Sequence, residues 1–436
     1  MVVQDLRAAA VARTVAVWVA CPLALSYLFK KRHEHRHGPR KLLLDLDVYK
    51  LAAETALQRR DPYTVATRIG FLFVYPPFAL LLFLPLALAS LATVGLLWNA
   101  ASIAALQATI YLALRQVDVT QALGWTLPLT VASLGLSPVE QTLALGQLSL
   151  LLMGLVVGDL AQPDSSALKG VLIGTATGIK LVPGIFIPYL LATGQSRAAV
   201  RAVLTAASTV AVGAVAFPRD SVAFWTRYAF DAERVIPVHW PPNESLRAML
   251  TRVLHSGAAA VRPWALSSAA VLAAAALVVA LSSGDVLGTE VTAGIAATAL
   301  AGLLVSPVSH HHYWVWSVPN TIYLTAIARQ SGSRLVGTCA VAPVLVLLAR
   351  VNRWLLPGFT KNPDPMIELR PAALAAVNSV TFASVLQLAG LAWHMTGRRL
   401  RAGGPLGTGT ARGSLRSGFA AVRCFAARRA RAAGAF

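Results

Sequence analysis

The sequence predicts an all-α, polytopic integral membrane protein, and three observations carry that prediction. Of the 436 residues, 56% are hydrophobic and only 13% are charged, with a mean hydropathy of +0.62. So few charged residues would not cover the surface of a soluble domain of this length. The apolar residues form runs of roughly 18 to 25, long enough to cross a bilayer core of ~30 Å as helices. Alternating segments of ~10 residues, which a β-barrel would require, are not found.

The apolar runs predict about twelve transmembrane helices, because lipid offers no partner for unpaired backbone N–H and C=O groups. We do not expect the first run to be removed as a signal peptide, since KKRHEHRHGPRK follows it where a small-residue cleavage site would stand. The predicted spans cover 12–29, 72–95, 98–114, 122–136, 143–160, 170–192, 198–217, 263–283, 289–305, 313–328, 335–351 and 372–396.

The C-terminal segment 398–436 is the strongest marker of orientation. It contains about nine arginines and no acidic residue, and Lys/Arg-rich segments favour the cytoplasmic side. We therefore predict a transmembrane domain over residues 1–397 and a basic, disordered cytoplasmic tail beside anionic lipid headgroups. The net charge of +20 then does not indicate a nucleic-acid partner.

Counting spans from the two ends places the loops 30–71, 218–262, 306–312 and 352–371 outside the cytoplasm. The basic cluster in residues 30–41 opposes this arrangement, but most of the polar motifs gather in these loops. The sequence therefore predicts a site that acts on something presented at the outer face of the cytoplasmic membrane. The three cysteines are scattered and suggest neither a disulfide framework nor a metal site.

The segment LDLDVYKLAAETALQRRDPY (44–63) predicts an amphipathic helix that lies along the outer interface. Two interpretations of its acidic residues, Asp45 and Asp47, remain open. Either carboxylate can cap the helix and favour its dipole. Alternatively, a carboxylate near a lipid-linked substrate can accept the proton of an acceptor hydroxyl group.

Lys180 lies deep within an apolar stretch, where a charge costs ~2.5 kcal/mol or more. It either extends to the interface or pairs with a partner such as a lipid phosphate. The stretch around it predicts one span, or two short helices folded back at Lys180–Pro183.

SPVSHHHYWVW (306–316) contains three consecutive histidines, which point in different directions on a helix and so do not predict a metal site. It predicts either an aromatic belt or one imidazole directed at an anionic or sugar group. The loop HWPPNESLRAML contains Trp240 and Asn243, which suit sugar binding, or else serve loop packing. Gln147, alone in an apolar stretch, predicts an interhelical hydrogen bond.

In their order along the chain, these motifs resemble glycosyltransferase family 87 of the GT-C superfamily, the polyprenyl-phosphate-mannose-dependent α-mannosyltransferases of actinobacteria. The resemblance covers about residues 41 to 320. It rests on Asp45–Tyr49, Asp61–Tyr63, Tyr75–Pro77, Gly146–Gln147, Lys180–Pro183, Asn243–Leu246 and Ser306–Trp316.

The resemblance implies a GT-C-like bundle and an inverting transfer of mannose from polyprenyl phosphate to a glycolipid or lipoglycan hydroxyl. It places the catalytic base at Asp45, with Asp47 second. It places donor binding at His312 and Lys180, with His311 as a further candidate because the residues flanking the family histidine differ here. Tyr49, Trp240 and Asn243 are expected to bind acceptor or sugar.

The Asp-x-Asp pattern of Asp45 and Asp47 is also compatible with binding of a divalent cation, Mg²⁺ or Mn²⁺, although no metal ligands are assigned. The opposing hypothesis is a transporter or lipid-linked-sugar flippase, which performs no chemistry and often shows repeated halves with broken helices. Acidic residues are nearly absent from the predicted spans, and the polar groups gather on one face. Both observations favour the enzyme.

Overall fold

The computed structural model describes residues 16–37, 43–231, 233–234, 237–282, 288–350 and 371–401. Within these ranges the secondary structure is helical, with two isolated β-bridges and no strand, which confirms the all-α prediction. Of the predicted tail, only residues 398–401 lie in the described part, where they end the last helix.

The helices follow one another along the chain with short connections. The α-helices are α2 (Cys21–His37), α3 (Leu44–Leu57), α4 (Pro77–Phe83), α5 (Leu91–Gln116), α6 (Ala122–Ser133), α7 (Ser137–Leu145), α8 (Ser149–Leu160), α9 (Val171–Ile179), α10 (Phe186–Ala192), α11 (Ser196–Ala216), α12 (Pro218–Ala223), α13 (Leu246–Leu254), α14 (Gly257–Ser282), α15 (Gly288–Val305), α16 (Ser317–Ser331), α17 (Arg334–Ala349), α19 (Pro371–Val377) and α20 (Ser379–Arg401). The 3₁₀ helices are η3 (Leu84–Leu88), η4 (Val182–Ile185) and η6 (His311–Trp316), and the π-helical turns are η1 (Ala16–Ala20) and η5 (Phe224–Tyr228).

Several of these helices are apolar enough to belong to a membrane protein. Among the described residues, α5, α11 and α14 are long and apolar enough to cross a bilayer. The pairs α6–α7 and α19–α20 qualify together but are bent by 77° and 57°, which gives up to five spans by this criterion. Shorter apolar helices make up much of the remainder, so the count of about twelve stays a prediction.

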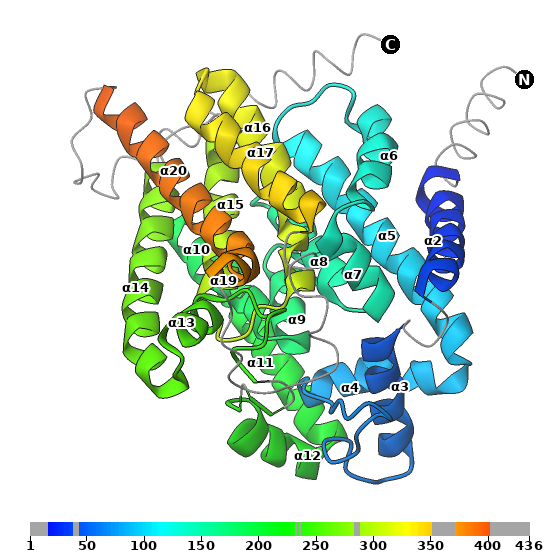
Figure 1. Cartoon of the computed structure of the whole chain (residues 1–436). Helices are drawn as coiled ribbons and strands as arrows, with labels where there is room; N and C mark the ends of the chain where they lie inside the picture. Colours follow the sequence, from blue (N-terminus) through cyan, green and yellow to red (C-terminus); the bar gives the residue numbers. More distant parts are fainter. Residues whose placement is uncertain are drawn as a thin grey trace, which may run out of the picture.

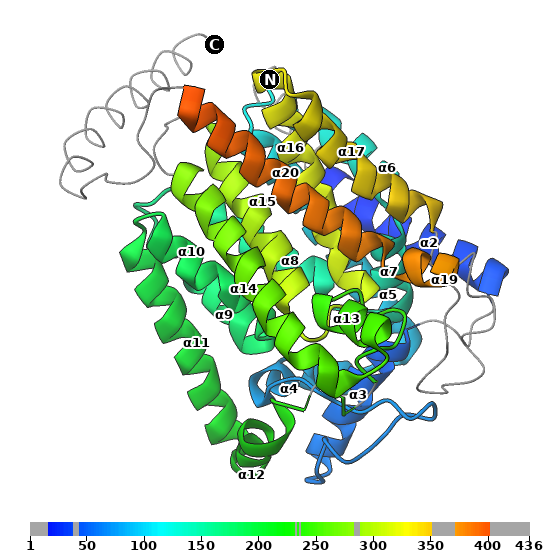
Figure 2. The same cartoon turned by 60° about the vertical axis from the view of Figure 1, so that its left-hand side comes forward.

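The long helices form a bundle, with the small elements α3, α4, α12 and α13 gathered at one end (Figures 1 and 2). Helix α9 packs closely on α11 because glycines recur at every fourth position of its sequence. A Cβ atom at Gly174 would lie 2.5 Å from the carbonyl oxygen of Ala202, and one at Gly178 would lie 2.0 Å from Oγ1 of Thr209. Small residues at this spacing allow two helix backbones to approach each other inside a membrane.

The apolar segments predicted as single spans are interrupted in two important places. The segment 170–192 forms α9 and α10, separated by Lys180 and the 3₁₀ turn η4. The segment folds back on itself at this break, as one of the two interpretations of the sequence predicts. Helix α9 lies along α11, with Gly170 beside Ala198 and Gly178 beside Thr209, and α10 then returns to the start of α11 at Ser196. The segment 72–95 contains the short pair α4 and η3, followed by an extended residue, Ala89, before α5 begins.

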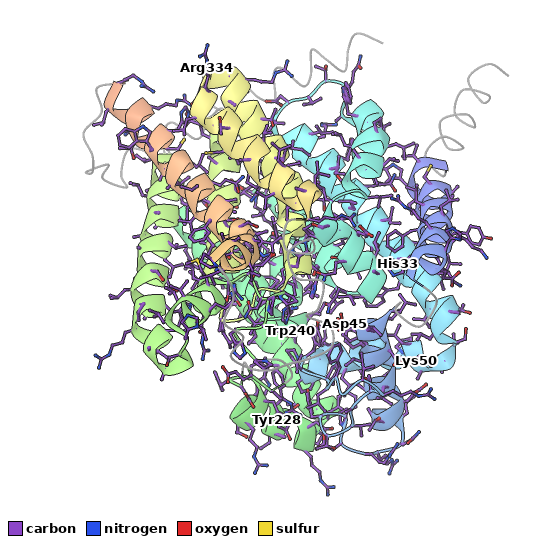
Figure 3. All side chains as sticks on the ribbon, in the orientation of Figure 1. His33, Asp45, Lys50, Tyr228, Trp240 and Arg334 are labelled. Atoms are coloured by element: carbon purple, nitrogen blue, oxygen red, sulfur yellow. The ribbon has the colours of Figure 1, made fainter. Side chains whose placement is uncertain are left out.

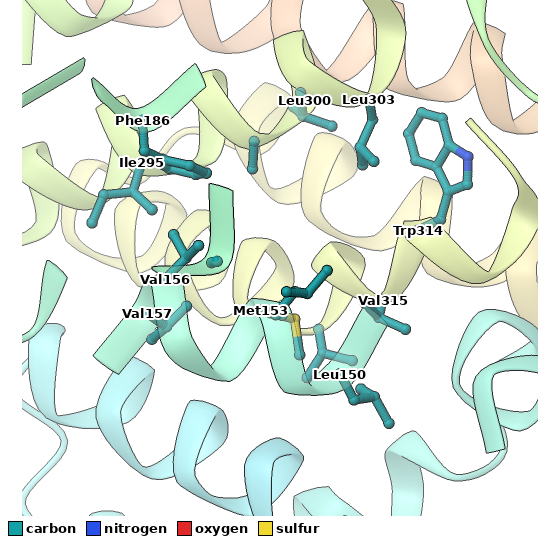
Figure 4. Close-up of a cluster of buried hydrophobic side chains, with 14 of the residues drawn as sticks. Leu150, Met153, Val156, Val157, Phe186, Ile295, Leu300, Leu303, Trp314 and Val315 are labelled. Carbon is teal, nitrogen blue, oxygen red and sulfur yellow. The ribbon is translucent and has the colours of Figure 1, made fainter. Parts of the chain in front are cut away.

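The middle of the bundle is filled by apolar side chains from α8, α10, α15 and η6 (Figure 4). Met153, Leu303 and Trp314 are almost entirely removed from solvent. This core lies directly beside the polar site, because Met153 and Leu303 also line a small cavity that reaches Lys180. Burial of such side chains stabilises the arrangement by about 1.5–3 kcal/mol each.

Candidate active site

A cavity of about 660 Å³ opens among the small elements at one end of the bundle. Its walls come from α3, the segment 71–76, the α7–α8 junction, the break after α9, the segment following α12, the start of α13, and residues 306–313. Of the predicted site residues, five line this cavity and three do not. The five are Asp45, Tyr49, Lys180, Trp240 and His312, and the other three are Asp47, Asn243 and His311. Asp45 and Trp240 lie near each other in the view of Figure 3, far from Arg334 at the opposite end of the bundle.

Asp45 is positioned by close packing between the start of α3 and the end of α7. The N–H of Leu43 donates a hydrogen bond to the carbonyl oxygen of Ala144 (2.6 Å), and α3 starts at the next residue. Gly146 ends α7 at a φ of 71°, a conformation that favours glycine. A Cβ atom there would lie 2.6 Å from Cβ of Leu46. Glycine at this position therefore allows α3 to reach the junction where Gln147 stands.

The acidic residues of α3 do not cap it. The N-cap residue is Leu43, in the left-handed region at a φ of 64°, and no side chain accepts a hydrogen bond from the first turn. The capping interpretation of Asp45 and Asp47 is therefore wrong, because the helix begins one residue before the first carboxylate. Both carboxylates lie in the first turn, where the helix dipole favours negative charge.

Gln147 connects the carboxylate to two buried tyrosines. Its Oε1 atom accepts hydrogen bonds from the hydroxyl groups of Tyr49 (3.0 Å) and Tyr75 (3.3 Å), whose oxygens lie 2.8 Å apart. With its carbonyl occupied in this way, the side chain donates a hydrogen bond to Asp45. The predicted interhelical hydrogen bond of Gln147 is thus present. The same side chain also lines the cavity and holds the acidic group.

Burial raises the pKa of Asp45 from 3.8 to about 6, although the hydrogen bond from Gln147 and the charge of Lys180 lower it in part. A carboxylate with such a pKa is mostly ionised at neutral pH and still accepts a proton readily, which suits a general base. Burial also raises the pKa of Asp47, and the charge of Glu54 adds to this effect. Of these two residues of α3, Asp45 lines the cavity and Asp47 does not.

Lys180 stands at the interruption between α9 and η4, in extended conformation. Its Nζ atom lies 3.8 Å from the ring centroid of Tyr313 and 5.2 Å from that of Tyr75, at cation–π distances. Both rings line the cavity, as Lys180 itself does, so the ammonium lies at the cavity wall. No ion pair within the described ranges includes Lys180, which leaves its charge available to an anion in the cavity.

The rings of His310, His312 and Tyr313 form a cluster beside this lysine. The ring centroid of His312 lies 5.7 Å from that of His310 and 4.6 Å from that of Tyr313. The Nε2 atom of His312 is buried and has no hydrogen-bond partner among the described residues. Burial, reinforced by the charges of neighbouring cations, lowers the pKa of both imidazoles, to about 4 for His310. A neutral imidazole carries one N–H group, so it can act as a donor or an acceptor but adds no charge.

Comparison with known proteins decides the family. The family model described as "Glycosyltransferase family 87" matches residues 73–307, more than half of the chain. The chain belongs to glycosyltransferase family 87. This confirms the resemblance predicted from the sequence, and it agrees with a site assembled from the family's ordered motifs.

The curated relatives of this family 87 protein carry consistent names. A polyprenol-phosphate-mannose-dependent alpha-(1-2)-phosphatidylinositol pentamannoside mannosyltransferase of Mycobacterium tuberculosis is 32% identical over 294 residues, 65% of this chain and 67% of the relative. Two polyprenol-phosphate-mannose-dependent alpha-(1-2)-phosphatidylinositol mannoside mannosyltransferases are also similar. The one from M. tuberculosis is 27% identical over 76% of this chain and 80% of its own length. The one from Mycolicibacterium smegmatis is 26% identical over 72% of this chain and 76% of its own length. No solved structure gives a significant match.

In this family 87 protein, His311 is held by the protein and does not face the cavity. Its Nδ1 atom lies 2.8 Å from Oε1 of Glu244, and its Nε2 atom lies 2.8 Å from Oγ of Ser137. The Ser137 hydroxyl donates to the carbonyl oxygen of Leu347 (2.7 Å). Ser137 is therefore not arranged as a nucleophile that gives its proton to the imidazole, and the geometry indicates that His311 anchors η6.

Asn243 likewise joins two loops and leaves no polar group for a sugar. Its side-chain amide donates to the carbonyl oxygens of Val238 (2.9 Å) and Pro307 (3.2 Å). Its Oδ1 atom accepts from the N–H groups of Ser245 (3.2 Å) and Ser309 (2.8 Å). The side chain fixes the wall of the cavity that carries Trp240 and His310.

The described residues contain no group of three or more His, Cys, Asp or Glu side chains placed to hold a metal ion. The Asp-x-Asp pattern does not create such a site, because Asp45 lines the cavity and Asp47 does not. The donor set thus does not fit the divalent cation considered from the sequence, and no chemical step is assigned to a metal.

The sequence analysis missed several residues that line the cavity. Tyr75 begins one of the family motifs and Tyr313 follows the family histidine, but neither position alone predicts a cavity-lining role. Arg234 and Arg247 lie in the outer loop singled out for its aromatic and polar residues, but neither was chosen. An isolated polar residue in an apolar stretch was the available signal for Gln147, and an arginine between aromatic residues was the signal for Arg234.

Proposed function

We propose that the protein transfers a mannosyl residue from polyprenyl-phosphate-mannose to a hydroxyl group of a glycolipid or lipoglycan. One observation supports this most strongly. Three segments far apart in the sequence bring the carboxylate of Asp45, the ammonium of Lys180 and the imidazole of His312 to one cavity. The chain that builds this cavity belongs to family 87, and its relatives are named as mannosyltransferases with the same kind of donor.

In the proposed reaction, the acceptor hydroxyl oxygen attacks the anomeric carbon of mannose. Asp45 accepts the hydroxyl proton as the new C–O bond forms, and Gln147 keeps the carboxylate oriented through its hydrogen bonds. The bond between the anomeric carbon and the phosphate oxygen breaks on the opposite side. A β-linked donor then gives an α-linked product, so the reaction inverts the configuration.

The leaving group is polyprenyl phosphate, which departs as an anion and needs no acid catalyst, unlike the leaving group of a glycoside hydrolase. Lys180 is placed to offset the negative charge that grows on its oxygens. The unpartnered Nε2 atom of His312 offers a hydrogen-bonding group to the same phosphate or to the sugar. Preorganised groups of this kind are most effective in a cavity that excludes water.

The remaining walls suit the two substrates. A volume of about 660 Å³ lies within the range of small-molecule sites and admits the headgroups of both lipids. The rings of Tyr49 and Trp240 provide aromatic surface for sugar. The finer architecture belongs to the same proposal: a GT-C-like bundle of about twelve spans in the cytoplasmic membrane, with the cavity facing the outer side. Nucleotide sugars are not supplied there, which explains the lipid-linked donor.

The test is a transfer assay with radiolabelled polyprenyl-phosphate-mannose and a phosphatidylinositol mannoside acceptor, using membranes that contain equal amounts of each variant. We expect Asp45→Asn to lower the rate by about 10²–10⁴-fold, the usual contribution of a general base. Asp47→Asn is the matched control, because it removes a carboxylate from the same helix turn outside the cavity, and its rate should stay within a few-fold of wild type. Full activity in Asp45→Asn would remove that residue as the base, and absence of transfer by the wild type would refute the proposed reaction.

A further inference from the structure

Arg234 lies in the wall of the cavity and has hydrogen-bond donors that none of the described residues uses. Its Cζ atom lies 3.5 Å from the ring centroid of Tyr228 and 6.0 Å from that of Tyr63. One terminal nitrogen, Nη2, donates to the carbonyl oxygen of Tyr63. The other two, Nε and Nη1, are buried and have no acceptor among the described residues. The guanidinium group is thus held in place on one side and unpartnered on the other.

Arg247 brings a second guanidinium group to the same cavity. It lies in the first turn of α13, which is fixed because the Ser245 side chain caps the helix through the N–H of Ala248. Its Cζ atom lies 5.4 Å from the ring centroid of Trp264, which also lines the cavity. Throughout the ranges that the structure describes, no ion pair includes Arg234 or Arg247.

A buried charged donor without a partner is costly, so such groups are commonly completed by a ligand. The planar fork of arginine matches the two oxygens of a phosphate, and its stacking on an aromatic ring leaves the edge of the group free to donate. We propose that Arg234, assisted by Arg247, forms a second anion site in this cavity, which holds the phosphodiester group of the acceptor lipid. This inference rests on the proposed function, because it assigns the acceptor to the same cavity.

The position of Lys180 indicates which cation binds the donor phosphate and which cations bind the acceptor phosphodiester. The donor phosphate is bonded to the anomeric carbon that is attacked, so it must lie close to the catalytic carboxylate. Lys180 lines the cavity with Asp45, and its charge lowers the pKa of that carboxylate. We therefore assign the leaving phosphate to Lys180 and the acceptor phosphodiester to the arginines. A glycolipid acceptor carries its reacting hydroxyl one or more sugars away from its phosphodiester, and this gives it the necessary reach.

The experiment measures KM separately for donor and acceptor with purified, full-length protein. Two acceptors are compared: a phosphatidylinositol mannoside and an uncharged alkyl mannoside. We expect Arg234→Gln to raise KM for the phosphate-bearing acceptor by about 10- to 100-fold, as expected for loss of a charge-assisted hydrogen bond. KM for the donor and for the alkyl mannoside should change by less than about twofold. Arg234→Lys keeps the charge but lacks the planar fork, so its KM for the phosphate-bearing acceptor should lie between those of the wild type and Arg234→Gln.

Arg227→Gln is the matched control, because Arg227 lies on the same segment but is exposed and does not line the cavity. A higher KM for the donor in Arg234→Gln would overturn the assignment to the acceptor. Equal losses with both acceptors, or no change with either, would overturn the anion site itself and leave Arg234 as a support for Tyr63.

Native mass spectrometry of the phosphatidylinositol mannoside complex provides a readout that does not need catalysis. Weaker binding by Arg234→Gln than by Arg227→Gln supports the site, and equal binding refutes it. If the wild type bound this lipid through Arg234 but transferred no mannose, the proposed reaction would fail while the anion site would stand.

Discussion

The pH dependence of the reaction should report the environment of Asp45, and Gln147→Leu should move it. The general base works only when it is ionised, and burial raises the pKa of Asp45 to about 6. In the wild type, about nine-tenths of the carboxylate is then ionised at pH 7 and about one-tenth at pH 5. The rate at low substrate concentration, kcat/KM, should fall about tenfold per pH unit below 6.

Removing the Gln147 side-chain amide should raise this pKa further, because its hydrogen bond stabilises the charged form. A hydrogen bond to a charged group contributes about 1.5–3 kcal/mol, which corresponds to about 1–2 pH units. The acidic limb of Gln147→Leu should therefore lie near pH 7–8. At pH 7 the variant should have about a tenth to a half of the rate that it reaches when Asp45 is fully ionised. Its rate should rise toward that value as the pH increases.

The assay measures initial rates of mannose transfer from pH 4.5 to 9 at constant ionic strength, with both substrates below KM. Other groups are not expected to create this limb. His310 and His312 have lowered pKa values, and the donor phosphodiester keeps one charge throughout. Asp47→Asn serves as the control and should retain the wild-type limb. An unchanged limb in Gln147→Leu, or a wild-type limb near 4, would refute the proposed environment of the base.

Three further outcomes follow from the geometry. Gly146→Ala should destabilise the protein by about 1–3 kcal/mol, measured as thermal unfolding in detergent. Gly194→Ala is its control, because Gly194 also has a positive φ, 77°, but an added Cβ would meet nothing within 4 Å; equal losses in the two variants would show that the contact with α3 is unimportant. Excess EDTA should leave the transfer rate within about twofold, because the described residues contain no group of three or more His, Cys, Asp or Glu side chains placed to hold a metal ion; activity lost to EDTA and restored by Mg²⁺ or Mn²⁺ would contradict this. In a cysteine-free background, Arg60→Cys should react with an impermeant maleimide on intact cells and Arg334→Cys should not, and the reverse pattern would invert the proposed orientation.

The sequence was sufficient to select the residues whose position along the chain coincides with a family motif. Asp45, Lys180 and His312 were predicted in this way, and the structure places all three around one cavity. Composition alone was enough for the helical membrane class, because lipid leaves so few alternatives for an apolar backbone.

The orientation of neighbouring side chains could not be predicted from the sequence. His311 and His312 are adjacent, yet one contacts Glu244 and Ser137 while the other faces the cavity. The partners of His311 lie 67 and 174 residues away along the chain, so no local pattern reveals them. The same holds for Asn243, whose amide suits a sugar by chemistry but is fully used by backbone groups.

The interruptions in the helices have a shared physical cause. Asp45 lies in the first turn of α3, Gln147 follows the left-handed residue Gly146, Lys180 stands in the break between α9 and η4, and His312 belongs to a 3₁₀ turn. Inside a membrane, irregular backbone is tolerated only where protein buries it or where it borders a polar cavity. In a continuous helix the backbone N–H and C=O groups are hydrogen-bonded to each other, and side chains extend only from the sides of the helix. Breaking the helices at the cavity brings polar side chains from distant segments to one point. For the same reason, hydropathy predicts the apolar content of these segments correctly but cannot predict the shorter helices into which they are divided.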